Sequence, residues 1–115
     1  MSSILSIEDQ TYVFIGESTK IEGNISFHGS TRVAGIVKGS IEMSSDELLV
    51  IEPSGQVYGD IICKDLEVHG KVEGTINIRG NLVVQAYGEV SGDINAKNIV
   101  VHPGAILNIN GHTSL

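Results

Sequence analysis

The four histidines and the single cysteine are the residues of this 115-residue chain that could do acid–base, nucleophilic or metal chemistry. The histidines His28, His69, His102 and His112 all fall at positions that the residue pattern places in solvent or near the end of the chain. A general base needs an orienting acid or a nucleophile within hydrogen-bond reach, and no such partner stands at a recognisable spacing. The sequence therefore predicts no catalytic residue and no enzyme.

Metal and cofactor sites are equally unsupported. His69 and His102 are 33 residues apart, but two histidines fall short of the three or four protein ligands of a zinc site. Cys63 belongs to a series of inward positions, where a free thiol acts as a small core hydrophobe. No glycine-rich stretch opens a helix, as a phosphate-binding loop must. We expect neither a metal nor a cofactor.

A short repeat indicates the elements that organise the chain. The motif is an aliphatic residue, any residue, glycine, any residue and a second aliphatic residue. It occurs at residues 21–25, 37–41, 57–61, 72–76 and 90–94. The central glycines are 16, 20, 15 and 18 residues apart, a period of about 17 that is typical of repeat architectures.

Strict alternation is the stronger signal. Between residues 66 and 96 every even position is apolar or glycine, and the odd positions are polar except Val83 and Tyr87. A period of two indicates extended chain with one buried face. A straight strand of this length would measure roughly 100 Å, so the chain must turn repeatedly. The inward parity is odd before and after this segment, and we expect an extra corner residue at each switch, near Lys64 and Lys97.

The pattern predicts an all-β, single-domain parallel β-solenoid. We expect about six coils of about 17–18 residues, each with three short faces. The boundaries predicted are a short flexible tail over 1–11, the β-helix over 12–110 and a second tail over 111–115. A hairpin sandwich would need turn dipeptides between strands, and Asn-Gly occurs only at Asn110 and Gly111.

Charge and composition exclude several classes of protein. The formal net charge is −7, which argues against a nucleic-acid binder because phosphate contacts need clustered Lys and Arg. The sequence contains no run of 18 apolar residues, so it predicts no membrane-spanning helix. Residues 1–10 do not resemble a signal peptide. One cysteine fits a reducing compartment. We therefore expect a cytoplasmic protein.

Residues 15–27 resemble the opening coil of the bactofilins, the bacterial polymer-forming cytoskeletal proteins. Residues 33–41 are similar to the next coil of that family, and residues 72–76 match a later one. The resemblance implies a right-handed three-sided β-helix that polymerises end to end, without nucleotide, into non-polar filaments. It also implies a scaffold that sets cell shape and positions cell-wall enzymes or other morphogenetic proteins at the inner face of the cytoplasmic membrane.

Two features depart from that family. Many relatives carry a phenylalanine in the last coil, whereas phenylalanine occurs here only at positions 14 and 27. Some relatives begin with a membrane-targeting segment. Here the apolar residues Ile4, Leu5 and Ile7 are followed by Glu8 and Asp9, which do not favour an anionic membrane.

The end coils are the surfaces that the sequence assigns to self-association. A solenoid exposes unpaired backbone and core at both ends unless a cap covers them, and no helical cap is predicted. The predicted contact residues are Tyr12, Phe14 and Ile15 in the first coil, and Ile106, Leu107 and Ile109 in the last. The lateral surface is acid-rich, and Val83 with Tyr87 is predicted to form a small partner patch on it.

An alternative from another class is a trimeric acyltransferase with a left-handed hexapeptide repeat. Ile15, Ile21, Phe27 and Val33 are spaced six residues apart, as that repeat requires. The hexad fails afterwards, because glycine and serine occupy positions 39 and 45. The scaffold therefore remains the preferred interpretation.

Overall fold

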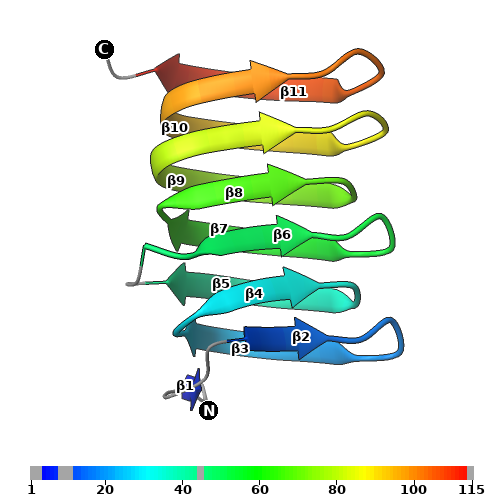
Figure 1. Cartoon of the computed structure of the whole chain (residues 1–115), viewed down its shortest axis with the longest axis vertical. Helices are drawn as coiled ribbons and strands as arrows, with labels where there is room; N and C mark the ends of the chain where they lie inside the picture. Colours follow the sequence, from blue (N-terminus) through cyan, green and yellow to red (C-terminus); the bar gives the residue numbers. More distant parts are fainter. Residues whose placement is uncertain (1–3, 8–11, 44–45, 114–115) are drawn as a thin grey trace.

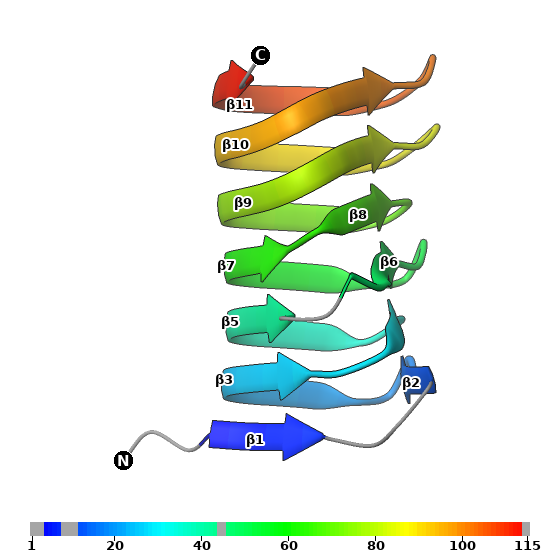
Figure 2. The same cartoon turned by 60° about the vertical axis from the view of Figure 1, so that its left-hand side comes forward.

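The chain winds into a right-handed parallel β-solenoid (Figures 1 and 2). The structure, a computed structural model, describes residues 4–7, 12–43 and 46–113, and the side chains of residues 12–43 and 46–108. Its strands form one 11-stranded sheet in which all pairings are parallel. They are β1 (Ile4–Ile7), β2 (Tyr12–Ile15), β3 (Lys20–Phe27), β4 (Ser30–Val33), β5 (Ile36–Met43), β6 (Leu48–Ile51), β7 (Gln56–Cys63), β8 (Asp65–Val68), β9 (Lys71–Val84), β10 (Glu89–Val101) and β11 (Ile106–Thr113).

Each coil has three faces. A long strand such as β5 forms the first face up to a glycine, here Gly39, and the second face after it. A corner then leads to a short strand such as β6, which forms the third face. In β9 and β10 the strand continues around the corner without interruption. The predicted all-β solenoid of about six coils is confirmed, and its right-handed winding excludes the left-handed hexapeptide fold.

A column of five glycines makes the bend between the first and second faces. Their φ angles are +125° at Gly23, +136° at Gly39 and Gly59, +142° at Gly74 and +118° at Gly92. Residues with a Cβ rarely adopt such angles. The glycines also stack in register, and a Cβ at Gly74 would lie under 3.0 Å from the backbone oxygen of Gly59. The repeat motif is therefore explained by a bend that only glycine fits.

The core consists of inward rows that run parallel to the solenoid axis, one residue per coil. One row begins at Ile21 and ends at Leu107, and both of these residues are only partly buried. The four residues between them are fully buried. They are Val37, Val57, Val72 and Val90. The alternation of the sequence is thus confirmed as alternation between core and surface.

The parity switches have a different cause from the one predicted. The corner between the second and third faces has two residues where β3 leads into β4, His28 and Gly29, and two within β9, Arg79 and Gly80. At Lys64 and at Lys97 a single residue makes the same corner, and the register shifts there. An odd number of corner residues reverses the alternation. The prediction of an extra residue was therefore wrong, because each switch corresponds to one residue fewer.

The solenoid extends beyond the boundaries that the sequence predicts. The strand β1 lies within segment 1–11 and pairs in parallel with residues 24–27 of β3. The strand β11 continues to Thr113, and its residues 106–113 pair with residues 89–96 of β10. In both places the edge of the neighbouring coil presents unpaired backbone N–H and C=O groups. A segment in extended conformation can form hydrogen bonds with them. Tail and coil therefore do not separate at residues 11 and 110.

Candidate functional site

The N-terminal contact residues predicted from sequence lie on the third face, in the edge strand β2. Among the described strands it pairs only with β4. Ile15 points inward and is buried, whereas Tyr12 and Phe14 point outward with 56% and 60% of their surface exposed. The structure therefore places the two aromatic side chains on the lateral surface beside the end, rather than over the open core.

The C-terminal contact residues are divided in the same way. Leu107 points inward and packs partly buried against the core. Ile106 pairs in register with Glu89 and is exposed on the lateral surface of the first face. The backbone of Ile109 pairs with Gly92, but its side chain lies outside the described residues.

Sequence reasoning missed Ile99 and Val101 as residues of the C-terminal end. They belong to the part of β10 on the third face, over which no further strand lies within the described residues. Val101 is 44% exposed, although its register partner Val84 is fully buried. The inward parity of both residues was visible in the sequence. Their exposure depends on the face at which the last described strand ends. The alternation of polar and apolar residues in the sequence does not reveal this.

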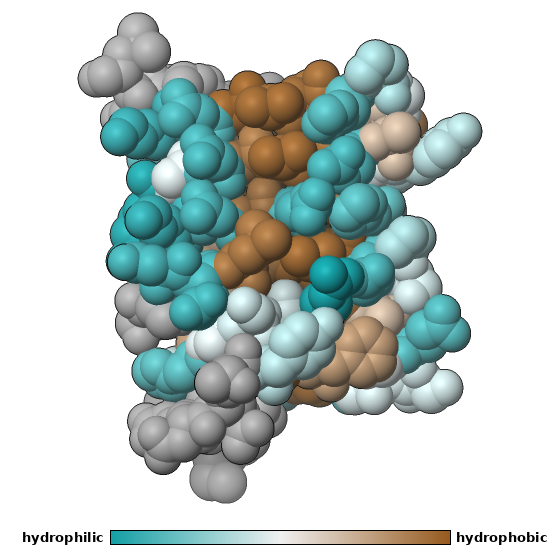
Figure 3. Space-filling view, in the orientation of Figure 1, coloured by the Kyte–Doolittle hydropathy of each residue, from teal (hydrophilic) through white to brown (hydrophobic). Residues whose placement is uncertain are grey.

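The predicted lateral patch spans the third face and the turn that follows it. Val83 is half-buried on the face and lies in register with Val100, which is 47% exposed. Figure 3 shows an apolar band along this face between hydrophilic flanks. Tyr87 lies in the following turn, is exposed, and has a left-handed φ of +69°, uncommon for a residue other than glycine. These side chains are exposed or half-buried on the lateral surface.

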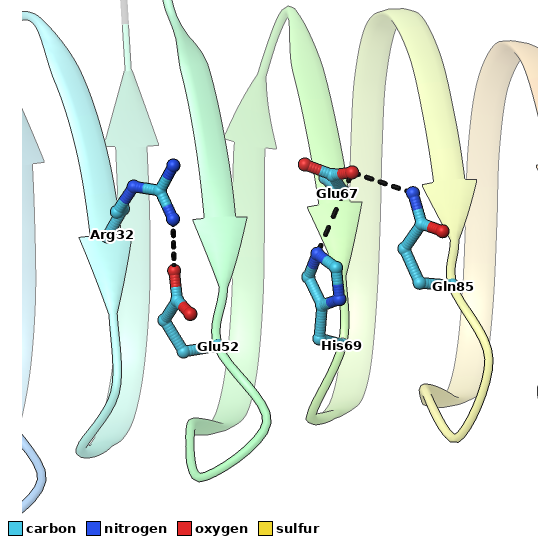
Figure 4. A network of polar contacts seen from close by, with 5 residues as sticks. All are labelled: Arg32, Glu52, Glu67, His69 and Gln85. Carbon is cyan, nitrogen blue, oxygen red and sulfur yellow. Dashed lines mark hydrogen bonds and ion pairs between the residues drawn. The ribbon is translucent and has the colours of Figure 1, made fainter.

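Two polar contacts link neighbouring coils at the edge of the third face (Figure 4). The Arg32 guanidinium donates a hydrogen bond to Glu52 at 2.6 Å. The Glu52 carboxylate, and secondarily the nearby Tyr12 hydroxyl, raise the pKa of Arg32 above its ordinary value. Farther along the rod, the Gln85 amide donates to Glu67 at 2.7 Å. These contacts join neighbouring coils, and the Arg32 guanidinium is already paired with Glu52.

The same Glu67 carboxylate also approaches one of the candidate histidines. Its Oε1 atom lies 3.6 Å from His69 Nε2, and both side chains are partly exposed. Among the described residues, no serine, threonine or cysteine side chain is hydrogen-bonded to His69, so His69 is not part of a nucleophile–base pair there. Likewise, no three His, Cys, Asp or Glu side chains in the described ranges gather into a metal-binding group.

Cys63 is fully enclosed in the core, in register with the buried Ile78. Burial, with the negative charge of Asp65 as a smaller cause, raises the pKa of its thiol to about 12. The thiolate is the reactive form of cysteine. The side chain is therefore a core hydrophobe rather than a nucleophile.

We expect the Cys63 thiol to resist alkylation in the folded protein. At pH 8 iodoacetamide should label native protein at least about 100 times more slowly than protein in 6 M guanidinium chloride, because the native thiol is both un-ionised and enclosed. Mass spectrometry of timed samples measures both rates. Labelling at similar rates in the two states would contradict this burial.

Together these features define a class of protein: a parallel β-solenoid with edge strands and partly exposed core residues at its ends. A family model described as bactofilin, polymer-forming cytoskeletal, matches residues 13–113, and the chain belongs to this family. The resemblance noted in the sequence is confirmed.

One curated relative is Bactofilin BacO of Myxococcus xanthus (strain DK1622). It is 40% identical over 62 residues, which make up 54% of this chain and 48% of that protein. The chain thus spans about half the length of the curated relative it matches. No solved structure gives a significant match. Within the described ranges there is no helix of the length and hydropathy needed to cross a membrane.

Proposed function

We propose that this protein polymerises end to end, without nucleotide, into filaments that serve as a cytoskeletal scaffold. The observation that carries the proposal is the inward row from Ile21 to Leu107, whose interior members are fully buried and whose two end members are partly exposed. Burying apolar surface contributes about 25 cal/mol per Å². Stacking a second copy on each end covers these residues and extends the hydrogen-bond ladders of the edge strands.

We also propose that like ends meet, so that the filament has no polarity. The two ends differ in how well they cover the core: Val13 and Ile15 are 8% and 6% exposed at the N-terminal end, whereas Val101 is 44% exposed at the other. Two different surfaces can each be self-complementary about a two-fold axis. Family membership supports this arrangement.

The filament would act as a non-enzymatic platform in the cytoplasm, at the inner face of the membrane, for cell-wall enzymes or other morphogenetic proteins. Support comes from the family and from the side chains themselves, since no nucleophile is bonded to His69 among the described residues and Cys63 is enclosed. A lone cysteine fits the reducing cytoplasm.

Arginine substitutions at the two ends test the mechanism. Leu107→Arg places a charge in the C-terminal contact and Ile21→Arg places one in the N-terminal contact. In a two-fold contact each charge faces its own copy, so repulsion adds to the desolvation cost. We expect either single variant to form dimers and the double variant to remain monomeric, as measured by sedimentation velocity. Wild-type filaments should form equally with and without ATP or GTP, as seen by electron microscopy.

Asn77→Arg is the matched control, because Asn77 is exposed on the second face of β9, an interior coil with described strands on both sides. This variant should polymerise like wild type. Circular dichroism should report the same β-structure for all variants, which separates failure to assemble from failure to fold. Long filaments of a folded double-end variant would show that the contacts are lateral and that the proposal is wrong.

A further inference from the structure

Unequal turns between the third and first faces create a notch on the side of the rod. The turns at residues 16–19 and 52–55 have four residues each, and the intervening turn has two, Ala34 and Gly35. Figure 1 shows the short turn between its two longer neighbours. The long turns stand on either side of Ala34, and the space between them and the third face is a cavity of about 800 Å³.

The lining of this notch combines aromatic rings with carboxylates. Tyr12 and Phe14 contribute exposed rings from the third face, Glu17 comes from the first turn, and Pro53 comes from the other. At the floor the Ser54 hydroxyl donates a hydrogen bond to the Ala34 carbonyl at 2.8 Å, which joins the second long turn to the short one. The cavity lies within the usual volume range of small-ligand sites, so it admits a few residues rather than a folded domain.

The charge of the notch selects for a cation. Its positive group, Arg32, is already paired with Glu52 at 2.6 Å. Glu17 is exposed, and no cation among the described residues pairs with it. Two carboxylates against one guanidinium leave a net negative charge, on a chain whose own net charge is −7. Aromatic faces beside a carboxylate attract Lys and Arg side chains through cation–π and ionic contacts.

We propose that this notch binds an extended peptide segment of a partner protein in which a Lys or Arg stands beside an apolar residue. The cation pairs with Glu17 and lies against the rings of Tyr12 and Phe14, while the apolar neighbour packs on Pro53. The site lies on the side of the rod, beside the edge strand β2 and not over the open core. It differs from the lateral patch predicted from sequence, which lies near the other end of the rod.

The test is selection of random heptapeptides displayed on phage against immobilised wild-type protein, with counter-selection against Glu17→Lys. Enriched sequences should carry Lys or Arg next to an apolar residue. Synthetic, dye-labelled versions should lose about ten-fold or more in affinity for Glu17→Lys and for Phe14→Ala, as measured by fluorescence anisotropy. The matched controls are Tyr87→Ala, an exposed aromatic in another turn, and Glu73→Lys, an exposed acid on the first face, and both should bind like wild type.

Circular dichroism and sedimentation of each variant accompany the binding measurements, so that a folding or assembly defect is recognised. The two notch variants differ in chemistry, so one remains informative if the other fails to fold. The proposal is overturned if no sequence is enriched on wild type over Glu17→Lys, or if the enriched peptides lack basic residues. It is also overturned if the control variants lose as much affinity as the notch variants.

Discussion

Gly74→Ala should destabilise the protein by about 3–5 kcal/mol and lower its melting temperature by on the order of 10–20 °C. Two effects add. The φ of +142° at this position is unfavourable for alanine, and the new Cβ would collide with the backbone oxygen of Gly59. Backbone atoms in the middle of a stacked column cannot move aside without shifting the neighbouring coils. Thermal unfolding followed by circular dichroism measures the loss.

Two other glycines provide matched controls for this substitution. Gly104 also has a positive φ, +94°, but the nearest atom to an added Cβ is 3.7 Å away. Gly104→Ala should therefore cost only about 1 kcal/mol, the conformational part of the effect. At Gly16 the nearest atom is a ring carbon of Phe14 at 3.8 Å, so Gly16→Ala should be close to neutral. Equal losses for Gly74→Ala and Gly104→Ala would mean that the close approach of coils contributes nothing.

Val72→Asp is the second substitution for which we expect a large effect. Val72 is fully buried in the middle of an inward row, between Val57 and Val90. A carboxylate there would have no water, and the neighbours in its row are aliphatic. We expect a loss of at least about 4 kcal/mol in the free energy of unfolding, measured by urea titration.

The adjacent residue is the control for Val72→Asp. Glu73 is exposed on the outward side of the same strand, and Glu73→Lys should change the free energy of unfolding by less than about 0.5 kcal/mol. The two substitutions are at adjacent positions, but the side chain of one faces the core and that of the other faces solvent. Similar losses in both would contradict the assignment of alternate residues to core and surface.

Sequence was sufficient for the fold because burial in a solenoid is encoded locally. Whether Val72 or Glu73 faces the core follows from parity alone, and the glycine motif reports a bend that every coil repeats. The same parity rule could have placed Tyr12 and Phe14 on the lateral surface, since they alternate with the buried Val13 and Ile15. Their apolar character alone had suggested an end contact.

Other features could not be predicted because they depend on the relation between coils. The exposure of Val101 follows from the absence of a strand over one of three faces among the described residues. The notch beside Ala34 exists because a two-residue turn lies between two four-residue turns. A count of residues gives each turn length, but only the stacked structure brings the side chains of three successive coils into one cavity.

The parallel ladders that join the coils have a consequence for growth. Their hydrogen bonds run along the rod, so each coil is laid on the edge of the one before it and serves as its template (Figure 2). In such a stack, stability is approximately a sum of contacts between nearest neighbours. In the filament proposed above, each added molecule would pair its edge strands with the end of the filament. This is the same edge-to-edge pairing of strands that joins neighbouring coils when one chain folds. Solution conditions that strengthen the contact between coils should then raise the melting temperature and lengthen the filaments together.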